Sequence, residues 1–350
     1  MNYIGSKIKL LPFLQANMES ILQKHSKPLV DCVFCDIFAG TGAVGRLFKP
    51  KVKQMISNDK EYYSFVLNQN YIANNTEIKD KEKLFDELNS NALTPPIEGK
   101  IYKHYCLGHT RFENNKIDFK NKEFQRQYFS DYNGAKIDAI RTKIEHWRKS
   151  GAITQNTYFH LLASLLESAD RVANTASVYG AFLKSLKKSA LIPLILKPID
   201  FLISNQNNCV FNTDSNTLIQ KIKGDILYLD PPYNAREYGA NYHLLNTIAL
   251  YDNFIPRGKT GLREYEKSAY CKKREVASAL ETLIKNAKFE WIFLSYNDEG
   301  LLSLESLQEI LSKYGKYSYV AQKHQRFKAD SSRTHKQDST LEYLHILHKE

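Results

Sequence analysis

The alternation of apolar and polar stretches along the chain predicts two kinds of structural element. Seven apolar runs bounded by turn or acidic residues are typical of buried strands, and they cover residues 30–38, 54–58, 209–213, 225–229, 291–296, 317–322 and 341–348. Amphipathic helical stretches lie between them at residues 60–74, 241–250, 276–287 and 302–313. Strand and helix therefore alternate at both ends of the chain, which predicts an α/β fold with a mostly parallel sheet and helices on both faces.

The middle of the chain has a different pattern. From about residue 75 to residue 198 the strand signals fade, and helical periodicity takes over at residues 135–149, 154–174 and 176–191. We therefore expect one α/β domain made of residues 1–75 and 199–350. A mainly helical insertion, residues 76–198, interrupts it.

Composition and charge narrow the class of protein. The 350 residues are 43% hydrophobic and 25% charged, which is ordinary for a globular protein and excludes disordered tails and coiled coils. The net charge of +11 favours a polyanionic partner, with nucleic acid as the first candidate. No apolar run approaches the ~20 residues of a membrane span, and the five cysteines suit a reducing compartment. We therefore expect a cytoplasmic protein that does not bind membranes.

A glycine-rich turn follows the first predicted strand. In the segment 39–45, Gly40, Gly42 and Gly45 have G-x-G-x-x-G spacing, which lets a ligand lie against the backbone near a helix N-terminus. The second strand ends at Asn58-Asp59, about 20 residues after the first glycine, where a carboxylate commonly binds ribose hydroxyls. Both NAD and S-adenosylmethionine fit this arrangement, since each carries an adenosine ribose.

A second motif, Asp230-Pro231-Pro232-Tyr233, follows the buried strand at residues 225–229. Two prolines end a strand abruptly at the carboxyl edge of the sheet, where open α/β folds bind their ligands. Because proline has no N–H group, the carbonyl oxygens of this turn and the Asp230 carboxylate can accept from an exocyclic amine. Two such acceptors favour the pyramidal nitrogen that attacks a methyl group. Tyr233 offers a flat face on which a flipped base can stack.

The order of these motifs resembles the D12 class, the Dam-like family of adenine-specific DNA methyltransferases. Further segments carry the resemblance at both ends of the chain: Asn2-Tyr3-Ile4-Gly5-Ser6-Lys7, Asp36-Ile37-Phe38 before the glycine turn, and Asn212-Thr213-Asp214. The resemblance implies a Rossmann-like class I methyltransferase sheet of seven strands, one of them antiparallel. It also implies that the helical insertion recognises the target sequence. An NAD-binding site is less favoured, because it would leave the motif at residues 230–233 and the basic net charge unexplained.

The same resemblance assigns roles to individual residues. Asp230, Pro231, Pro232 and Tyr233 are the expected catalytic residues. The expected S-adenosylmethionine site consists of Tyr3, Lys7, Asp36, Phe38, Gly40, Gly42, Asp59 and Asp214.

The implied activity is methylation of N6 of an adenine flipped out of double-stranded DNA, in a restriction-modification or related DNA-modification system. A cognate restriction endonuclease is then a candidate partner. Three alternatives stay open: structured RNA as the substrate, cytosine N4 as the target atom, and a catalytically silent DNA-binding module.

Other clusters of residues have an ordinary structural interpretation beside a functional one. Cys32 and Cys35 form a C-x-x-C within a predicted strand, so we interpret them as packing residues and expect no metal site. Residues 257–274 hold seven Lys or Arg against two Glu, which suits either a phosphate clamp or a solvated loop. Residues 100–149 hold 12 basic and six acidic residues. Candidate DNA contacts near the C-terminus are Lys323, Arg326, Lys328, Arg333 and Lys336.

Overall fold

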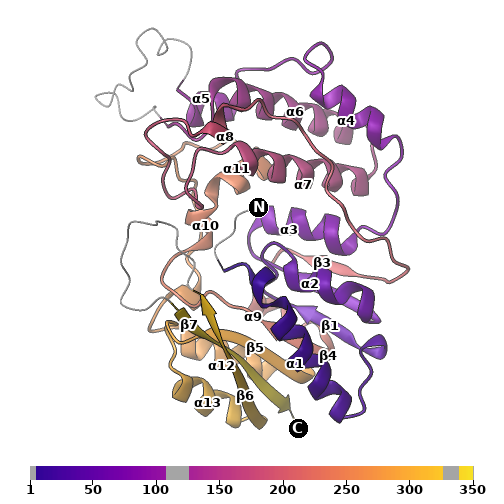
Figure 1. The fold of residues 1–350 in the computed structure, drawn as a ribbon, viewed down its shortest axis with the longest axis vertical. Coiled ribbons are helices and arrows are strands. Elements are labelled where there is room, and N and C mark those ends of the chain that lie inside the picture. The colour runs from indigo at the N-terminus through magenta and orange to yellow at the C-terminus, as the bar shows by residue number, and fades with distance from the viewer. Residues whose placement is uncertain (1–4, 108–125, 326–338, 350) are drawn as a thin grey trace. The chain divides into compact units, whose positions relative to one another are not determined.

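A computed structural model of the chain describes residues 5–107, 126–325 and 339–349 (Figure 1). These residues divide into two compact units. The sheet unit consists of residues 5–75, 202–238 and 266–350, and the helical unit contains residues 76–201 and 239–265. Arg326, Lys328, Arg333 and Lys336 of the proposed C-terminal DNA contacts lie outside the described residues.

The sheet unit contains one sheet of seven strands in the order β3-β2-β1-β4-β5-β7-β6. Strand β7 runs antiparallel to its neighbours β5 and β6, and the pairs that join β3, β2, β1, β4 and β5 are parallel. The predicted seven-stranded α/β sheet is therefore confirmed, and its order is consistent with a class I methyltransferase fold. The strands are β1 Val33–Asp36, β2 Gln54–Asn58, β3 Cys209–Phe211, β4 Lys223–Leu229, β5 Lys288–Asn297, β6 Gly315–Gln325 and β7 Ser339–Lys349.

Helices cover both faces of this sheet because parallel strands bury both of their faces. On one face, Leu227 of β4 and Ile292 of β5 share a core cluster with α12 (Val276–Asn286) and α13 (Leu304–Ser312). On the other face, Phe48 of α2 (Ala43–Phe48) stacks on Phe34 of β1 at 4.7 Å between ring centroids. The remaining helices of the unit are α1 Leu11–Lys24, α3 Tyr62–Asn68 and α9 Ser215–Leu218.

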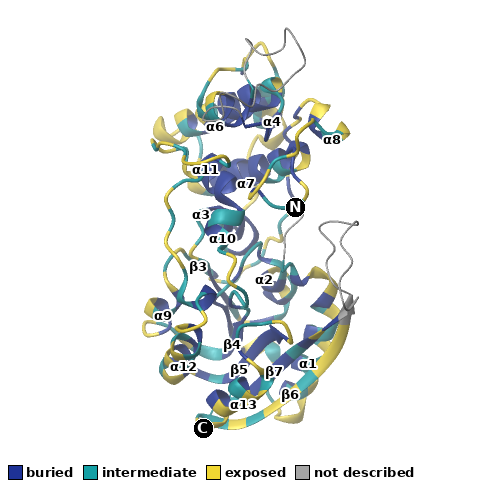
Figure 2. Cartoon of the chain, turned by 90° about the vertical axis from the view of Figure 1, so that its left-hand side faces the viewer, coloured by how far each residue is buried: buried dark blue, intermediate teal, exposed yellow. Residues whose placement is uncertain are grey.

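The helical unit is built on two long helices, α6 (Asp131–Lys149) and α7 (Gln155–Val172). The side chains of Ser130 and Thr154 cap their N-termini by accepting from backbone N–H groups, which satisfies donors that have no partner within the helix. Most of α7 is buried, as Figure 2 shows. The other helices are α4 Lys81–Asn89, α5 Lys100–Tyr105, α8 Lys188–Leu191, α10 Tyr238–Asn241 at the boundary of the units, and α11 His243–Leu250.

Residues 239–265, which the sequence analysis grouped with the α/β domain, pack within the helical unit. The reason is visible around α11, where the ring of the buried His243 lies against Tyr105 and Tyr128. No helix among the described residues is long and apolar enough to cross a bilayer.

The predicted helix at residues 176–191 is wrong, since only α8 (Lys188–Leu191) is helical there. The side chain of Asn174 donates to the carbonyl oxygens of Gln127 and Leu183 and accepts from the backbone N–H of Lys187. Tyr179 is fully buried, and its N–H donates to the carbonyl of Asn241. These contacts with distant residues replace the local hydrogen bonds that a helix would need.

Candidate active site

The predicted site residues gather at the carboxyl edge of the parallel strands. Strand β1 ends at Asp36, β2 is followed by Asp59, and β4 is followed by Asp230. Because β2, β1 and β4 are parallel neighbours, these three carboxylates follow adjacent strand ends at the edge where open α/β sheets bind their ligands.

The glycine turn after β1 has the backbone that its residues predict. Gly40 and Gly42 have φ angles of 51° and 77°, a left-handed region in which a side chain would cause strain. A Cβ on Gly42 would also lie 2.8 Å from Oδ1 of Asn68. The side chain of Asn68 donates to the carbonyl of Gly40 at 3.1 Å, and Ser64 donates to the same oxygen. Helix α3 therefore holds the turn in place through two polar side chains that the sequence analysis missed.

Asp59 joins the second strand to this turn. Its Oδ2 accepts from the N–H of Gly40 at 2.8 Å, and its Oδ1 accepts from the N–H of Glu61 at 2.9 Å. Burial raises the pKa of Asp59, and these donors partly oppose that shift. Ser64 and the N–H of Lys60 also lower the pKa of Asp59, so several donors surround its carboxylate, and ligand hydroxyls would share the two oxygens with them.

Asp36 is the most deeply buried carboxylate of this edge. Its side chain is 1% exposed, and Oδ1 has no hydrogen-bond partner within the described part of the chain. Burial, followed by the charges of Asp230 and Asp59, holds the pKa of Asp36 well above its usual range. A buried acceptor without a donor is costly, which marks Asp36 as a site for a cationic or hydrogen-bonding ligand.

The remaining predicted cofactor residues lie near the ends of β1 and β3. The ring of Phe38 packs edge-on against the buried Tyr270 at 5.0 Å between centroids. Asp214 caps α9, since its Oδ1 accepts from the N–H of Thr217 at 3.0 Å. The buried Asn58 donates to the carbonyls of Ile37 and Thr213, which ties the ends of β1 and β3 together. Tyr3 lies outside the described residues.

Lys7 lies against the proposed catalytic turn. Its Nζ is 3.1 Å from Oδ1 of Asp230 and 3.7 Å from Oε2 of Glu342, which belongs to β7. The same nitrogen lies 5.6 Å from the ring centroid of Tyr233. Lys7 is 4% exposed, so this cation is buried between two carboxylates. Glu342 was not foreseen, although a Glu inside an apolar strand pattern is a signal that could have identified it.

Burial and these charges determine the pKa of the Asp230 carboxyl group. Burial raises the pKa of Asp230 to about 6, with Lys7 lowering it and Glu342 raising it. Burial alone would lower the pKa of Lys7, but Asp230 and Glu342 outweigh this effect and hold it above its usual value. Lys7 therefore stays protonated and keeps Asp230 ionised at neutral pH.

Tyr233 is fixed through its backbone and its ring. Its carbonyl accepts from the N–H of Leu301 at 2.9 Å, and its ring lies edge-on to Tyr296 at 6.1 Å between centroids. Gly5 has a φ angle of 78°, and a Cβ there would lie 2.7 Å from the hydroxyl of Tyr238 and 3.7 Å from that of Tyr233. A glycine at position 5 therefore lets the backbone lie close to the side chains of Tyr238 and Tyr233. Pro231 is buried and Pro232 is partly buried.

Within residues 5–107, 126–325 and 339–349, no group of three His, Cys, Asp or Glu side chains could hold a metal ion. Cys32 and Cys35 are both buried and free.

Comparisons with known proteins agree on one family. The family model for D12 class N6 adenine-specific DNA methyltransferases matches residues 3–310. The chain is 56% identical over 351 residues to the type II methyltransferase M.NlaIII of Neisseria lactamica, an alignment that covers 100% of this chain and 99% of that protein. It is 37% identical to M.CviAII of Paramecium bursaria Chlorella virus 1, over 95% of this chain and 94% of that protein. It is also 37% identical to M.FokI of Planomicrobium okeanokoites, over 100% of this chain and 53% of that protein. No solved structure matches. The chain belongs to the D12 class of N6 adenine-specific DNA methyltransferases.

Proposed function

We propose that this methyltransferase is the modification enzyme of a type II restriction-modification system, and that it uses S-adenosylmethionine to methylate an adenine flipped out of double-stranded DNA. The observation that carries the catalytic part is the buried pair of Lys7 and Asp230 beside Tyr233, at the end of β4. The type II assignment rests on relatives such as M.NlaIII, which is similar over its full length. We propose that the enzyme acts in the cytoplasm and that a cognate restriction endonuclease is its partner in the same restriction-modification system.

The chemistry of the sheet edge fits S-adenosylmethionine, which supplies an electrophilic methyl group when bound. The buried Oδ1 of Asp36 has no partner among the described residues, and we assign it to a cationic amino group. The turn at Gly40 and Gly42 exposes backbone without side chains, so a ligand can lie against it. We assign the carboxylate of Asp59 to ribose hydroxyls. Phe38 and Asp214 complete the proposed site.

Asp230 is the proposed acceptor for the amine of the flipped adenine. The carboxylate of Asp230 and the Pro231 carbonyl would each accept one hydrogen of the amine, while Lys7 fixes the orientation of the carboxylate. Holding an amine in line with a methyl group supplies much of what this reaction needs. Tyr233 would stack on the base and so offset part of the few kcal/mol that flipping costs.

The helical unit is the proposed reader of the DNA sequence. Its long helices come from the predicted recognition insertion, residues 76–198, and residues 239–265 add the exposed basic side chains of Arg257 and Lys259. Basic side chains of this kind neutralise phosphates and position the protein, while other side chains read base edges.

The decisive experiment compares Asp230, which follows β4, with Asp225, which lies near the start of the same strand. Asp230→Ala should abolish transfer of labelled methyl groups to DNA while cofactor and DNA binding persist, because Asp230 acts mainly on the transition state. Asp225→Ala is the matched control, since Asp225 pairs with Lys27 at the opposite end of β4.

The wild-type protein should leave N6-methyladenine in plasmid DNA of a methylation-free host, detected by modified-base sequencing. An active preparation that modifies no adenine would contradict the proposal.

A further inference from the structure

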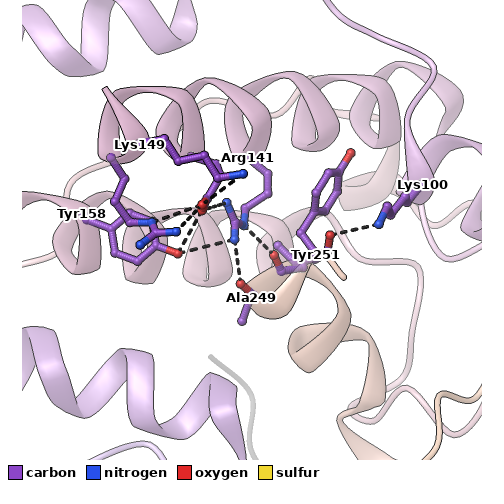
Figure 3. Close-up of polar contacts among 9 residues, drawn as sticks. Lys100, Arg141, Lys149, Tyr158, Ala249 and Tyr251 are labelled. Atoms are coloured by element: carbon purple, nitrogen blue, oxygen red, sulfur yellow. Dashed lines mark hydrogen bonds and ion pairs between the residues drawn. The ribbon is translucent and has the colours of Figure 1, made fainter. Parts of the chain in front are cut away.

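The end of helix α11 is held by a buried arginine. Arg141 donates from Nε to the carbonyl of Ile248 and from Nη2 to the carbonyl of Ala249, both at 3.0 Å (Figure 3). Its Nη1 also pairs with Glu145 at 3.0 Å. A cation at a helix C-terminus satisfies carbonyl groups that have no partner in the helix and interacts favourably with the helix dipole. Arg141 therefore stabilises the last turn of α11, from which the next segment begins.

That segment, which we call the 252–264 loop, is fixed at its root. Nζ of Lys100 donates to the carbonyls of Tyr251 and Asp252 at 3.0 and 2.6 Å, and to Oδ1 of Asn253 at 2.6 Å. Figure 3 shows Lys100 directed at the end of the helix. Arg263, from the far end of the loop, donates to both carboxylate oxygens of Asp252 at 3.1 and 2.8 Å. Both ends of the loop are thus held together.

The tip of the loop is equally well defined. Arg257 and Leu262 form an antiparallel bridge in which each N–H donates to the other carbonyl at 2.8 Å. Arg126 donates to the carbonyl of Gly258 at 2.9 Å, and the hydroxyl of Tyr105 donates to that of Gly261 at 2.7 Å. A buried arginine and a buried tyrosine of the helical unit therefore fasten the tip.

Ile255 lies between these anchors and is 85% exposed, the largest fraction among the exposed large hydrophobic residues of the described ranges. The exposed cations Arg257 and Lys259 follow it within four residues, and the Arg257 side chain is 74% exposed. A protein-binding surface would combine such a side chain with exposed apolar neighbours and few charges. Here the adjacent Phe254 and Pro256 are partly buried, and the exposed residues of the same loop are polar or charged: Asp252, Asn253, Arg257 and Lys259. Apolar wedges between DNA base steps occur beside cations that contact phosphates.

We propose that Ile255 is an apolar wedge that enters the base stack of the substrate DNA, while Arg257 and Lys259 contact neighbouring phosphates. This inference rests on the proposed function, because it requires a duplex in which one base must leave the stack. The fixed loop makes the wedge effective, since little conformational freedom is lost when the side chain enters the DNA.

The test uses two duplexes that differ only opposite the target adenine, which faces either thymine or an abasic site. Ile255→Ala should lose about ten- to hundredfold in single-turnover methylation rate on the paired duplex, because the wedge offsets the cost of unstacking and unpairing. On the duplex with the abasic site the loss should shrink to about threefold or less, because little pairing is left to break. Ile255→Met, which keeps an apolar side chain of similar reach, should retain most of the rate on both duplexes.

A second readout follows base flipping directly. With 2-aminopurine at the target position, Ile255→Ala should give a smaller fluorescence rise than the wild type, and Ile255→Met a rise close to it. Equal losses on the two duplexes, or a wild-type rate for Ile255→Ala on the paired duplex, would overturn the wedge while leaving the proposed function intact. A wild-type protein that methylates neither duplex would overturn both. Lys259→Gln should instead weaken binding on both duplexes alike and reduce its salt dependence.

Discussion

The charges around Asp230 predict opposite effects of two substitutions on the pH dependence of methylation. An ionised carboxylate accepts from the adenine amine more strongly than a protonated one, so the methylation rate should fall as pH decreases through the Asp230 pKa of about 6. Lys7 lowers this pKa and Glu342 raises it. Lys7→Met should therefore move the acid limb of the profile to higher pH, and Glu342→Gln should move it to lower pH.

The size of each shift follows from the distances. An opposite charge within about 4–6 Å shifts a carboxyl pKa by about 1–3 units, and Nζ of Lys7 lies 3.1 Å from Asp230. Removing it should move the limb upward by about 1–3 units. Glu342 raises the pKa of Asp230 by its charge, and it also contacts Lys7 at 3.7 Å. Neutralising Glu342 should therefore move the acid limb of the pH profile to lower pH by about one unit or less. The hydroxyls of Tyr228 and Tyr233 also face this cluster, but burial raises both pKa values and keeps them neutral at acid pH.

The assay is single-turnover transfer of labelled methyl groups between pH 5 and 9, with cofactor and DNA saturating, so that binding and product release do not mask the chemical step. Thermal unfolding of each variant checks that the fold survives. If both substitutions moved the acid limb in the same direction, or if neither moved it, the assignment of the limb to Asp230 would be refuted.

Three further predictions concern single positions. Asp59→Ala should weaken S-adenosylmethionine binding by about 1–3 kcal/mol, measured by calorimetric titration, and unchanged affinity in a folded variant would contradict its assignment to the ribose. Tyr233→Phe should stay active, whereas Tyr233→Ala should lose about ten- to hundredfold in rate together with the 2-aminopurine signal, because stacking is worth about 1–3 kcal/mol per base; equal damage by Phe would make the hydroxyl the working group. Gly261→Ala should lower the melting temperature more than Gly258→Ala, since both glycines have positive φ angles but only a Cβ on Gly261 would collide with Arg126 and Tyr105; equal shifts would mean that backbone strain alone matters.

The strands were predictable because burial on both faces leaves continuous apolar runs in the sequence. Residues 54–58 were predicted as a strand, and β2 has the same bounds. Helical periodicity was a less reliable guide at residues 176–191. The apolar spacing there is helical, but backbone groups of this segment form hydrogen bonds to Asn174 and Asn241 instead. Periodicity records which side chains are buried, and such hydrogen bonds between distant residues leave no trace in it.

The parts of the candidate site that could be predicted are those whose backbone conformation is determined by a few consecutive residues. The turns at Gly40 and at Asp230 follow their strands as expected, because glycine and proline restrict the backbone locally. The partners of Asp230 were not predictable in this way. Lys7 contacts Asp230, and Glu342 contacts Lys7. These residues are far apart in the sequence, so the cluster forms only in the assembled sheet.

The charges at the sheet edge predict how strongly the proposed cofactor and its product should bind there. Asp36, Asp59 and Asp230 have raised pKa values there, and Lys7 is the cation that the described contacts place beside Asp230. Such an edge favours a ligand that brings positive charge. S-adenosylmethionine carries that charge on its sulfonium and loses it when the methyl group leaves, so S-adenosylhomocysteine should raise the melting temperature less at equal concentration, since stabilisation by a ligand follows its affinity for the folded state. Asp36→Asn, which removes a carboxyl group that a positively charged ligand can help to ionise, should narrow the difference between the melting-temperature shifts of the two ligands. An equal or larger shift with S-adenosylhomocysteine would show that contacts other than charge determine the affinity.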